Sequence, residues 1–361
     1  MPIFLYALLT AGMVPVQPIH AQHMWTSIDG VLLIDVLVDS PGVSLVLMRH
    51  DGTTLATHKP APLQQIDVIS VMPAVLELDE PAYLQLVAES GEPLGSSLVI
   101  EPALSRRVPV METRHDEVRG EWKTVAGWQD EGAEEREDLP ESAGRIDSVA
   151  TPTAIPRDDA VVRSGWWVWG ETDVVLETDH GELTIDLRED AAPLTARNFR
   201  DLTARHFYDG TIAHRIIPEG RGGRPFVVQG GDPTGTGNGG PGHWLPLEPS
   251  TLGHAFGVIS MARSNDPDSA GSQWFIALDR EECARLDGLY CAFGEIVQGG
   301  ATIVSMATTP LADTDYFSSR PVNPPRIERG RIRPAPPRMP GKGRPDKRVP
   351  SPTEGLWQEA E

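Results

Sequence analysis

Two polar residues in apolar surroundings, Arg215 and Gln229, are the first candidates for chemistry in this chain. They lie in residues 213–232, where two β-favouring runs flank a Gly/Arg-rich loop at 219–224, a pattern that predicts a hairpin with an extended turn. A guanidinium is permanently charged and offers several N–H donors, and an amide both donates and accepts hydrogen bonds. A purely structural role stays open, in which Arg215 pairs with an acid such as Asp232.

Motifs for other chemistries are missing from the sequence. It contains no G-x-S-x-G and no H-E-x-x-H, and its histidines show no metal-ligand spacing. A literal G-x-G-x-x-G at 235–240 is followed by Pro241, whereas a dinucleotide-binding loop has to open a helix. Cys283 and Cys291 give neither a disulfide framework nor a zinc site, and they are either two buried apolar residues or a single bridge. The sequence therefore predicts neither metal nor cofactor.

Further along the chain, three blocks follow the hairpin in a fixed order. They are Gly-Val-Ile-Ser-Met-Ala at 257–262, Gly-Ser-Gln-Trp-Phe-Ile at 271–276 and Leu-Asp-Gly-Leu-Tyr-Cys-Ala-Phe-Gly at 286–294. Together with 213–232, and with Ala-Arg-Asn-Phe at 196–199, these blocks resemble the cyclophilins, which are peptidyl-prolyl cis-trans isomerases. Their order and spacing are close to those of that family.

The chemistry implied by this resemblance is rotation about an X-Pro amide bond. The bond has partial double-bond character, and its rotation barrier is roughly 18 to 20 kcal/mol. A catalyst needs a hydrogen-bond donor for the twisted amide and an apolar pocket for the proline ring, but no nucleophile and no metal. The resemblance implies that Arg215 is the donor, and that Gln229 and Phe226 complete the catalytic set.

The resemblance also implies a substrate groove. Its expected substrate-binding residues are Val227, Met261, Ala262, Arg263, Gln273, Phe275, Leu286 and Tyr290. Strand periodicity places Gln273 and Phe275 on one face, and Trp274 and Ile276 on the other, so that one face can line a groove while the other fills a barrel. The structural alternative is that the apolar members of the set are ordinary core residues.

Several positions depart from the family pattern. The loop at 219–224 lengthens the hairpin, and Val227 stands where a methionine is usual. Arg285 takes the place of a tryptophan found in many eukaryotic members, and Tyr290 that of a histidine, changes that are common in bacterial-type members. We expect weak cyclosporin binding, because Arg285 puts a hydrated charge at the rim of an apolar pocket.

Composition and the N-terminus constrain partners and location. A net charge of -21 argues against nucleic-acid binding, and no stretch is long and apolar enough to predict stable membrane insertion. Residues 1–22 resemble a signal peptide with a cleavage site after Ala21, although no Lys or Arg precedes the apolar run. We therefore expect a periplasmic or secreted protein. If Met24 is the true start, the protein is cytoplasmic.

The predicted fold class is mainly β, divided into segments of different character. Residues 24–112 read as a small β-sandwich-like domain, 113–163 as an acidic, Pro-bearing linker, and 164–333 as a closed antiparallel eight-stranded barrel with two helices. Residues 334–361 form a Pro/Arg-rich tail, which we expect to be disordered. The tail could also bind an acidic partner or fold back on the acidic body.

Two functional hypotheses follow from these observations. The first is a prolyl isomerase that acts on proline-containing unfolded or flexible protein substrates. The second is a binding module that holds proline segments in a cyclophilin-like groove without turnover. Arg215 favours the first hypothesis when it occurs together with Phe226, Gln229 and Phe275, because a scaffold has no need of the whole set.

Overall fold

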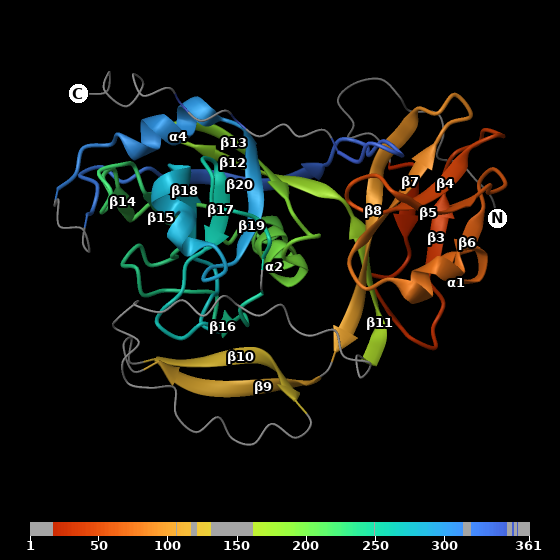
Figure 1. Cartoon of the computed structure of the whole chain (residues 1–361), viewed down its shortest axis with the longest axis horizontal. Coiled ribbons are helices and arrows are strands. Elements are labelled where there is room, and N and C mark those ends of the chain that lie inside the picture. Colours follow the sequence, from red (N-terminus) through yellow and green to blue (C-terminus); the bar gives the residue numbers. More distant parts are fainter. Residues whose placement is uncertain are drawn as a thin grey trace.

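The protein is mainly β and consists of two β units joined by long strands (Figure 1). The computed structural model describes residues 17–105, 107–116, 121–130, 162–248, 250–312, 319–344, 349 and 352, with the backbone alone between 105 and 162. We call residues 17–105 together with 162–170 the N-terminal unit, and residues 171–334 the barrel unit.

The N-terminal unit contains two sheets that share one core. The smaller sheet has the order β1 (Ile19–Ala21), β3 (Leu33–Val36), β6 (Gln65–Asp67). The larger sheet has the order β2 (Trp25–Ser27), β11 (Val162–Gly170), β8 (Pro93–Ser105), β7 (Ala82–Val87), β4 (Ser44–Met48), β5 (Thr54–His58). A short helix α1 (Val68–Val71) and the 3-10 turn η1 (Pro73–Glu77) follow β6.

Buried side chains from both sheets form a single cluster in this unit. Ile34 of β3, together with Leu45 of β4 and Leu84 of β7, is fully buried within it. Two sheets that bury their facing apolar residues against each other are the defining feature of a β-sandwich. The sandwich-like N-terminal unit is therefore confirmed.

The boundary between the two units differs from the expected one. Residues 164–170 were expected to open the second domain, but they belong to β11, which pairs antiparallel with β8 through Trp166 and Pro102. Trp166 is fully buried in the N-terminal core. The aromatic cluster before the barrel therefore completes the first unit rather than starting the second.

Part of the expected linker forms a two-stranded ribbon. Strand β9 (Arg107–Asp116) pairs antiparallel with β10 (Glu121–Asp130), and β10 pairs in parallel with β16 (His243–Trp244) of the barrel unit. Figure 1 shows the ribbon below the barrel, beside β16. The remainder of the predicted linker, up to residue 161, lies outside the described residues.

The barrel unit is an eight-stranded antiparallel sheet that curls back on itself. Its strands, in spatial order, are β14 (Arg215–Ile217), β15 (Val227–Gly230), β18 (Trp274–Ala277), β17 (Val258–Met261), β19 (Ala292–Gln298), β13 (Gly181–Leu187), β12 (Thr172–Thr178) and β20 (Ile327–Pro334). Ile212 bridges both Asp232 and Arg326, and so links the two ends of the sheet. This curled sheet is the barrel predicted from the sequence.

Two helices of at least two turns pack on the barrel, as predicted. Helix α2 (Pro193–Ala204) buries Ala196, Phe199 and Thr203, which recur at helical spacing. Helix α4 (Gly300–Ala307) follows Gly299, whose φ of 105° lies in the left-handed region. A shorter helix α3 (Arg280–Cys283) continues into the 3-10 turn η2 (Ala284–Leu286) beside β18. Among the described residues, no helix has both the length and the apolar character needed to cross a bilayer.

The first residues of the predicted disordered tail are packed against the protein. Arg338 is fully buried, and residues up to 344 make hydrogen bonds to both units. The expectation of a solvated tail is therefore wrong for residues 334–344, because their arginines pair with buried carboxylates. The alternative of a tail that folds back on the acidic body describes this part correctly.

Candidate functional site

Four neighbouring strands place two of the three predicted catalytic residues, Arg215 and Gln229, in one row with Phe275. Arg215 of β14 lies opposite Gln229 of β15, which in turn lies opposite Phe275 of β18. Phe275 lies opposite Ser260 of β17. Directly paired residues point to the same face of a sheet, so all four side chains share one face. The alternating positions, among them Ile216 and Val228, fill the barrel core.

The apolar part of the site is a small cluster that is separate from the barrel core. Its buried members are Ile217, Phe226, Val227, Phe275, Ala277, Cys283 and Leu286, with Ala262 and Tyr290 packed against them. Phe275 and Tyr290 meet edge to face, with ring centroids 5.6 Å apart. The cluster lies on the face that carries Arg215 and Gln229, as a pocket for a proline ring requires.

A chain of hydrogen bonds runs along the polar side of the row. Arg215 Nη1 donates to Gln229 Oε1 over 3.2 Å, and Gln229 Nε2 donates to Gln273 Oε1 over 3.2 Å. Gln273 Nε2 in turn donates to the carbonyl oxygens of Gly237 and Gly239, each over 2.9 Å. The glycine loop that imitates a dinucleotide motif therefore anchors Gln273, and through it the orientation of the guanidinium.

The predicted substrate-binding residues do not all reach this face. Met261 pairs with Trp274 and is buried in the barrel core, on the side opposite Phe275. Arg263 uses its guanidinium to bond the Leu289 carbonyl, over 3.0 Å from Nη2, and to cover the ring of Tyr290, 4.6 Å from Cζ to the centroid. Met261 therefore supports the groove from behind, and Arg263 shapes its rim.

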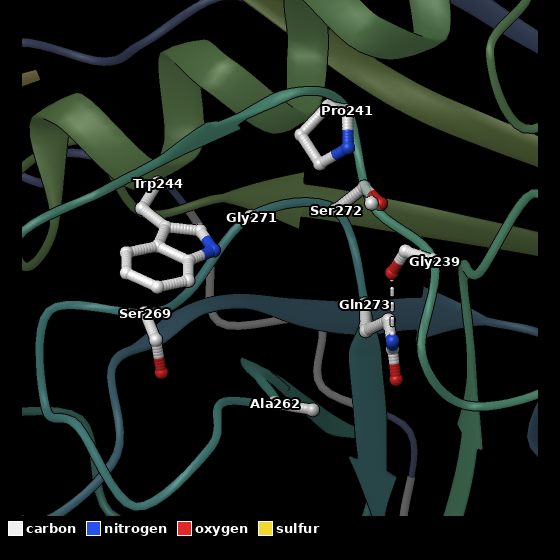
Figure 2. A pocket seen from close by; sticks show the side chains of 9 residues that line it. Gly239, Pro241, Trp244, Ala262, Ser269, Gly271, Ser272 and Gln273 are labelled. Atoms are coloured by element: carbon white, nitrogen blue, oxygen red, sulfur yellow. Dashed lines mark hydrogen bonds between the residues drawn. The ribbon is translucent and has the colours of Figure 1, made fainter. Parts of the chain in front are cut away.

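A small open pocket adjoins the polar end of the row (Figure 2). Gly239, Gly240, Pro241, Trp244, Ala262, Ser269, Gly271, Ser272 and Gln273 line it. Figure 2 shows the Gln273 side chain turned toward Gly239. Ala262 lines this pocket and also packs against the apolar cluster.

Behind Phe275 lies a histidine network that sequence reasoning did not find. The His254 ring contacts Asp287 Oδ1 from Nδ1 over 2.9 Å and Ser260 Oγ from Nε2 over 3.0 Å. Arg280 Nη2 donates to the other oxygen of Asp287 over 2.6 Å. Burial lowers the pKa of His254, against the Asp287 carboxylate, which raises it. In a neutral ring that carries its proton on Nδ1, Nε2 accepts a hydrogen bond from the Ser260 hydroxyl.

The arrangement of Ser260, His254 and Asp287 imitates a hydrolase triad but does not work as one. Ser260 is fully buried within β17, and the ring of Phe275 covers the histidine. A nucleophile must reach a carbonyl carbon, and no substrate atom reaches this hydroxyl. The three residues instead fix the ring of Phe275. Sequence spacing gives no signal for them, because Asp287 is 33 positions from His254.

The longer hairpin loop is pinned to α3 beside the apolar cluster. Gly222 N donates to Glu282 Oε2 over 2.8 Å, and Arg224 Nη2 contacts Glu281 Oε2 at 2.9 Å. Arg285 places its guanidinium over the ring of Phe226, 4.2 Å from Cζ to the centroid, and 3.6 Å from Glu282. Arg224 and Arg285, two of the arginines that depart from the family pattern, therefore form a charged rim beside the apolar cluster.

Both cysteines are free and buried, each in a different environment. Cys283 Sγ lies 3.1 Å from the Phe226 carbonyl, and Cys291 Sγ lies 3.3 Å from Thr195 Oγ1. Burial raises the pKa of the Cys283 thiol to about 11. The two cysteines are therefore small buried apolar residues and do not form the single bridge of the other interpretation. Among the residues that the structure covers, no three His, Cys, Asp or Glu side chains form a metal-binding group.

Comparison with known proteins bears on the barrel unit. Residues 173–332 match the family described as cyclophilin type peptidyl-prolyl cis-trans isomerase. Peptidyl-prolyl cis-trans isomerase-like 1 of Gibberella zeae is 38% identical over 166 residues, 45% of this chain and 94% of the relative. The protein of the same name from Aspergillus fumigatus is also 38% identical over 166 residues, 95% of its length.

A solved structure is also similar to this chain. It is a cyclophilin type peptidyl-prolyl cis-trans isomerase of Cryptosporidium parvum, determined in the presence of the dipeptide Ala-Pro. Its sequence is 32% identical, the match covers 44% of this chain and 98% of that one, and the TM-score is 0.39. A curated relative is 38% identical and is matched over 94% of its length. The chain therefore belongs to the cyclophilin-type peptidyl-prolyl cis-trans isomerase family.

Proposed function

We propose that the protein accelerates cis-trans rotation about X-Pro bonds in unfolded or flexible protein segments. The observation that carries this proposal is the hydrogen-bonded line from Arg215 through Gln229 to Gln273, set along the apolar cluster of Phe226, Phe275 and Leu286. A charged donor beside a pocket that fits a proline ring is the pair of features that rotation requires.

The mechanism is non-covalent. The apolar cluster holds the proline ring while the rest of the peptide turns about the amide bond. In the twisted state the prolyl nitrogen becomes pyramidal and the amide loses its conjugation, and the Arg215 guanidinium then interacts more strongly with the peptide than in either planar isomer. Gln229 orients the guanidinium in advance, so little reorganisation accompanies the rotation.

A protease-coupled assay on an Ala-Pro peptide tests the proposal with the full chain. We expect first-order isomerisation that rises linearly with protein concentration, and a large loss of rate in Phe275→Ala, which removes part of the pocket. A protein that binds the peptide but leaves the isomerisation rate unchanged would instead act as a proline-binding module, the second hypothesis.

The location of the protein and the character of the groove rim extend the proposal. We propose that the protein is periplasmic or secreted, because of the apolar run that ends before Ala21. Intact-mass measurement of the protein from its native host decides this point, and a mature chain beginning at Met1 or Met24 would overturn it.

We also propose a bacterial-type rim, supported by Arg285 and Tyr290 at the two positions where many eukaryotic members differ.

A further inference from the structure

The chain segment that follows β20 crosses from the barrel unit to the N-terminal unit (Figure 1). Ala335 N donates to the Glu171 carbonyl over 3.0 Å, and the Ala335 carbonyl accepts from Ser96 Oγ over 2.6 Å. Glu171 stands where β11 ends and β12 begins, and Ser96 belongs to β8. The segment therefore enters the junction between the units at its first residue.

Arg338 fills the centre of this junction. Its side chain is fully buried, with Nη2 donating to Glu171 Oε1 over 2.7 Å and Nε to Oε2 over 3.0 Å. The guanidinium covers the ring of Tyr83 in β7, with Cζ 3.4 Å from the centroid. The backbone N–H of Arg338 donates to Gln85 Oε1 over 2.9 Å. A residue from beyond the barrel thus becomes part of the N-terminal core.

Arg344 returns the segment to the barrel. It pairs with Glu171, 3.3 Å from Nη1 to Oε1, and also with Asp173 of β12 and Asp186 of β13. Glu171 thus pairs with both arginines. Arg338 also contacts the N-terminal unit, and Arg344 also contacts the barrel unit. We call Glu171, Asp173 and Asp186 the acidic socket. Unpaired buried carboxylates are costly, so the socket depends on the arginines that occupy it.

Between the two arginines, a tight turn docks on the turn at residues 50–52. Gly341 N donates to the Gly52 carbonyl over 2.8 Å. Gly343 has a φ of 63°, and a Cβ at this position would lie 2.4 Å from the His50 carbonyl oxygen. The contact is backbone against backbone, and any side chain at Gly343 would push the two turns apart.

We propose that residues 335–344 act as an intramolecular clasp, which holds the N-terminal unit against the barrel unit by occupying the acidic socket. Opening of the clasp loosens the N-terminal unit, which keeps the ion pair of Glu101 with Arg197 of α2. It leaves the barrel folded, because the barrel has its own closed sheet and its own core. The ribbon of β9 and β10, which pairs with β16 beside the pocket residue Trp244, loses its fixed position at the same time.

Hydrogen exchange measured by mass spectrometry on the full chain tests the clasp through two independent variants. Arg338→Ala removes the buried charge, whereas Gly343→Val keeps both charges and blocks the turn. Lys342→Ala is the matched control, since Lys342 is an exposed cation on the same turn. For both test variants we expect at least tenfold faster exchange in β4, β7 and β10, with rates in β15 and β18 unchanged, and no change in the control.

Three results would overturn the proposal. The first is an unchanged exchange pattern in Gly343→Val, and the second is equal acceleration in β15 and β18, which would mean general destabilisation. The third is a Lys342→Ala effect as large as that of Arg338→Ala. If Arg338→Ala does not fold, Gly343→Val decides alone, because it removes no charged side chain. None of these readouts depends on isomerase activity.

Discussion

The imidazole of His254 lies nearly parallel to the ring of Phe275, with centroids 5.6 Å apart and 12° between the planes. His254 is itself held between Asp287 and Ser260. Phe275 forms part of the expected floor for the proline ring, so the position of that floor depends on a residue that touches no substrate. His254 is therefore a positioning residue.

Two substitutions separate the stacking of His254 from its hydrogen bonds. His254→Phe keeps a ring beside Phe275, and we expect a KM close to that of the unmodified protein. We also expect a loss of about 1–3 kcal/mol in stability, because Asp287 and Ser260 lose a partner. His254→Ala removes the ring as well and should raise KM several-fold. Steady-state kinetics and chemical denaturation measure both effects, and an equal rise in KM for the two variants would contradict the stacking role.

Arg215 should carry the rate rather than the binding. By analogy with the removal of one preorganised donor, Arg215→Ala should cost on the order of 3 kcal/mol, or roughly a hundredfold in kcat/KM. Arg215→Lys should recover little, because a point charge does not replace a planar fork of donors. The coupled assay on an Ala-Pro peptide gives the rates, and circular dichroism checks the fold. Unchanged turnover in a folded Arg215→Ala protein would exclude the mechanism.

Cyclosporin should bind weakly, and Arg285 should be the reason. The guanidinium covers Phe226 and lies beside Glu282, so an apolar inhibitor has to displace or bury a paired charge. Arg285→Trp should raise the affinity at least tenfold, about 1.4 kcal/mol. Arg285→Ala separates loss of the charge from gain of an indole. Isothermal titration measures all three proteins, and nanomolar binding by the unmodified protein would refute this explanation.

Glu101 should make the protein less stable as the pH rises. Burial raises the pKa of Glu101 to about 7, although Arg197, 2.6 Å away, lowers it. Between about pH 4.5 and 7 the folded state therefore binds more protons than the unfolded state, and the free energy of unfolding falls with increasing pH. Glu101→Gln should reduce that fall by on the order of 2 kcal/mol. Urea denaturation at pH 5 and pH 8 measures the fall in the free energy of unfolding. Glu92→Gln, at an exposed position, is the control. The same pH dependence in both variants would be evidence against the effect.

The resemblance to the family implied the site residues, and strand periodicity agreed with it for Gln273 and Phe275. Arg215 and Gln229 each stand out as a polar residue in an apolar run, and the register of the sheet then brings them together with Phe275. Met261 was placed too close to the groove, because a four-residue strand buried on both faces has no polar alternation to mark its outer side. Pairing with Trp274 turns it inward.

What the sequence did not reveal depends on contacts between distant segments. His254 and Asp287 meet only in the folded chain, where η2 packs beside β18, and nothing in either local sequence marks the pair. Arg338 lies among prolines and glycines, a composition typical of a solvated tail. Its burial depends on Glu171, a carboxylate whose local sequence is that of an ordinary strand end.

The clasp joins residues that are synthesised far apart in time. Gln85 and Arg338 touch but are 253 residues apart in the chain. At 5–20 residues per second, a ribosome therefore makes the arginine roughly 13 to 50 seconds after its partner. During that interval the sandwich also waits for β11 to complete its larger sheet. The unit that is synthesised first therefore gains the last partner of Tyr83 and Gln85 only when the segment after β20 has been made.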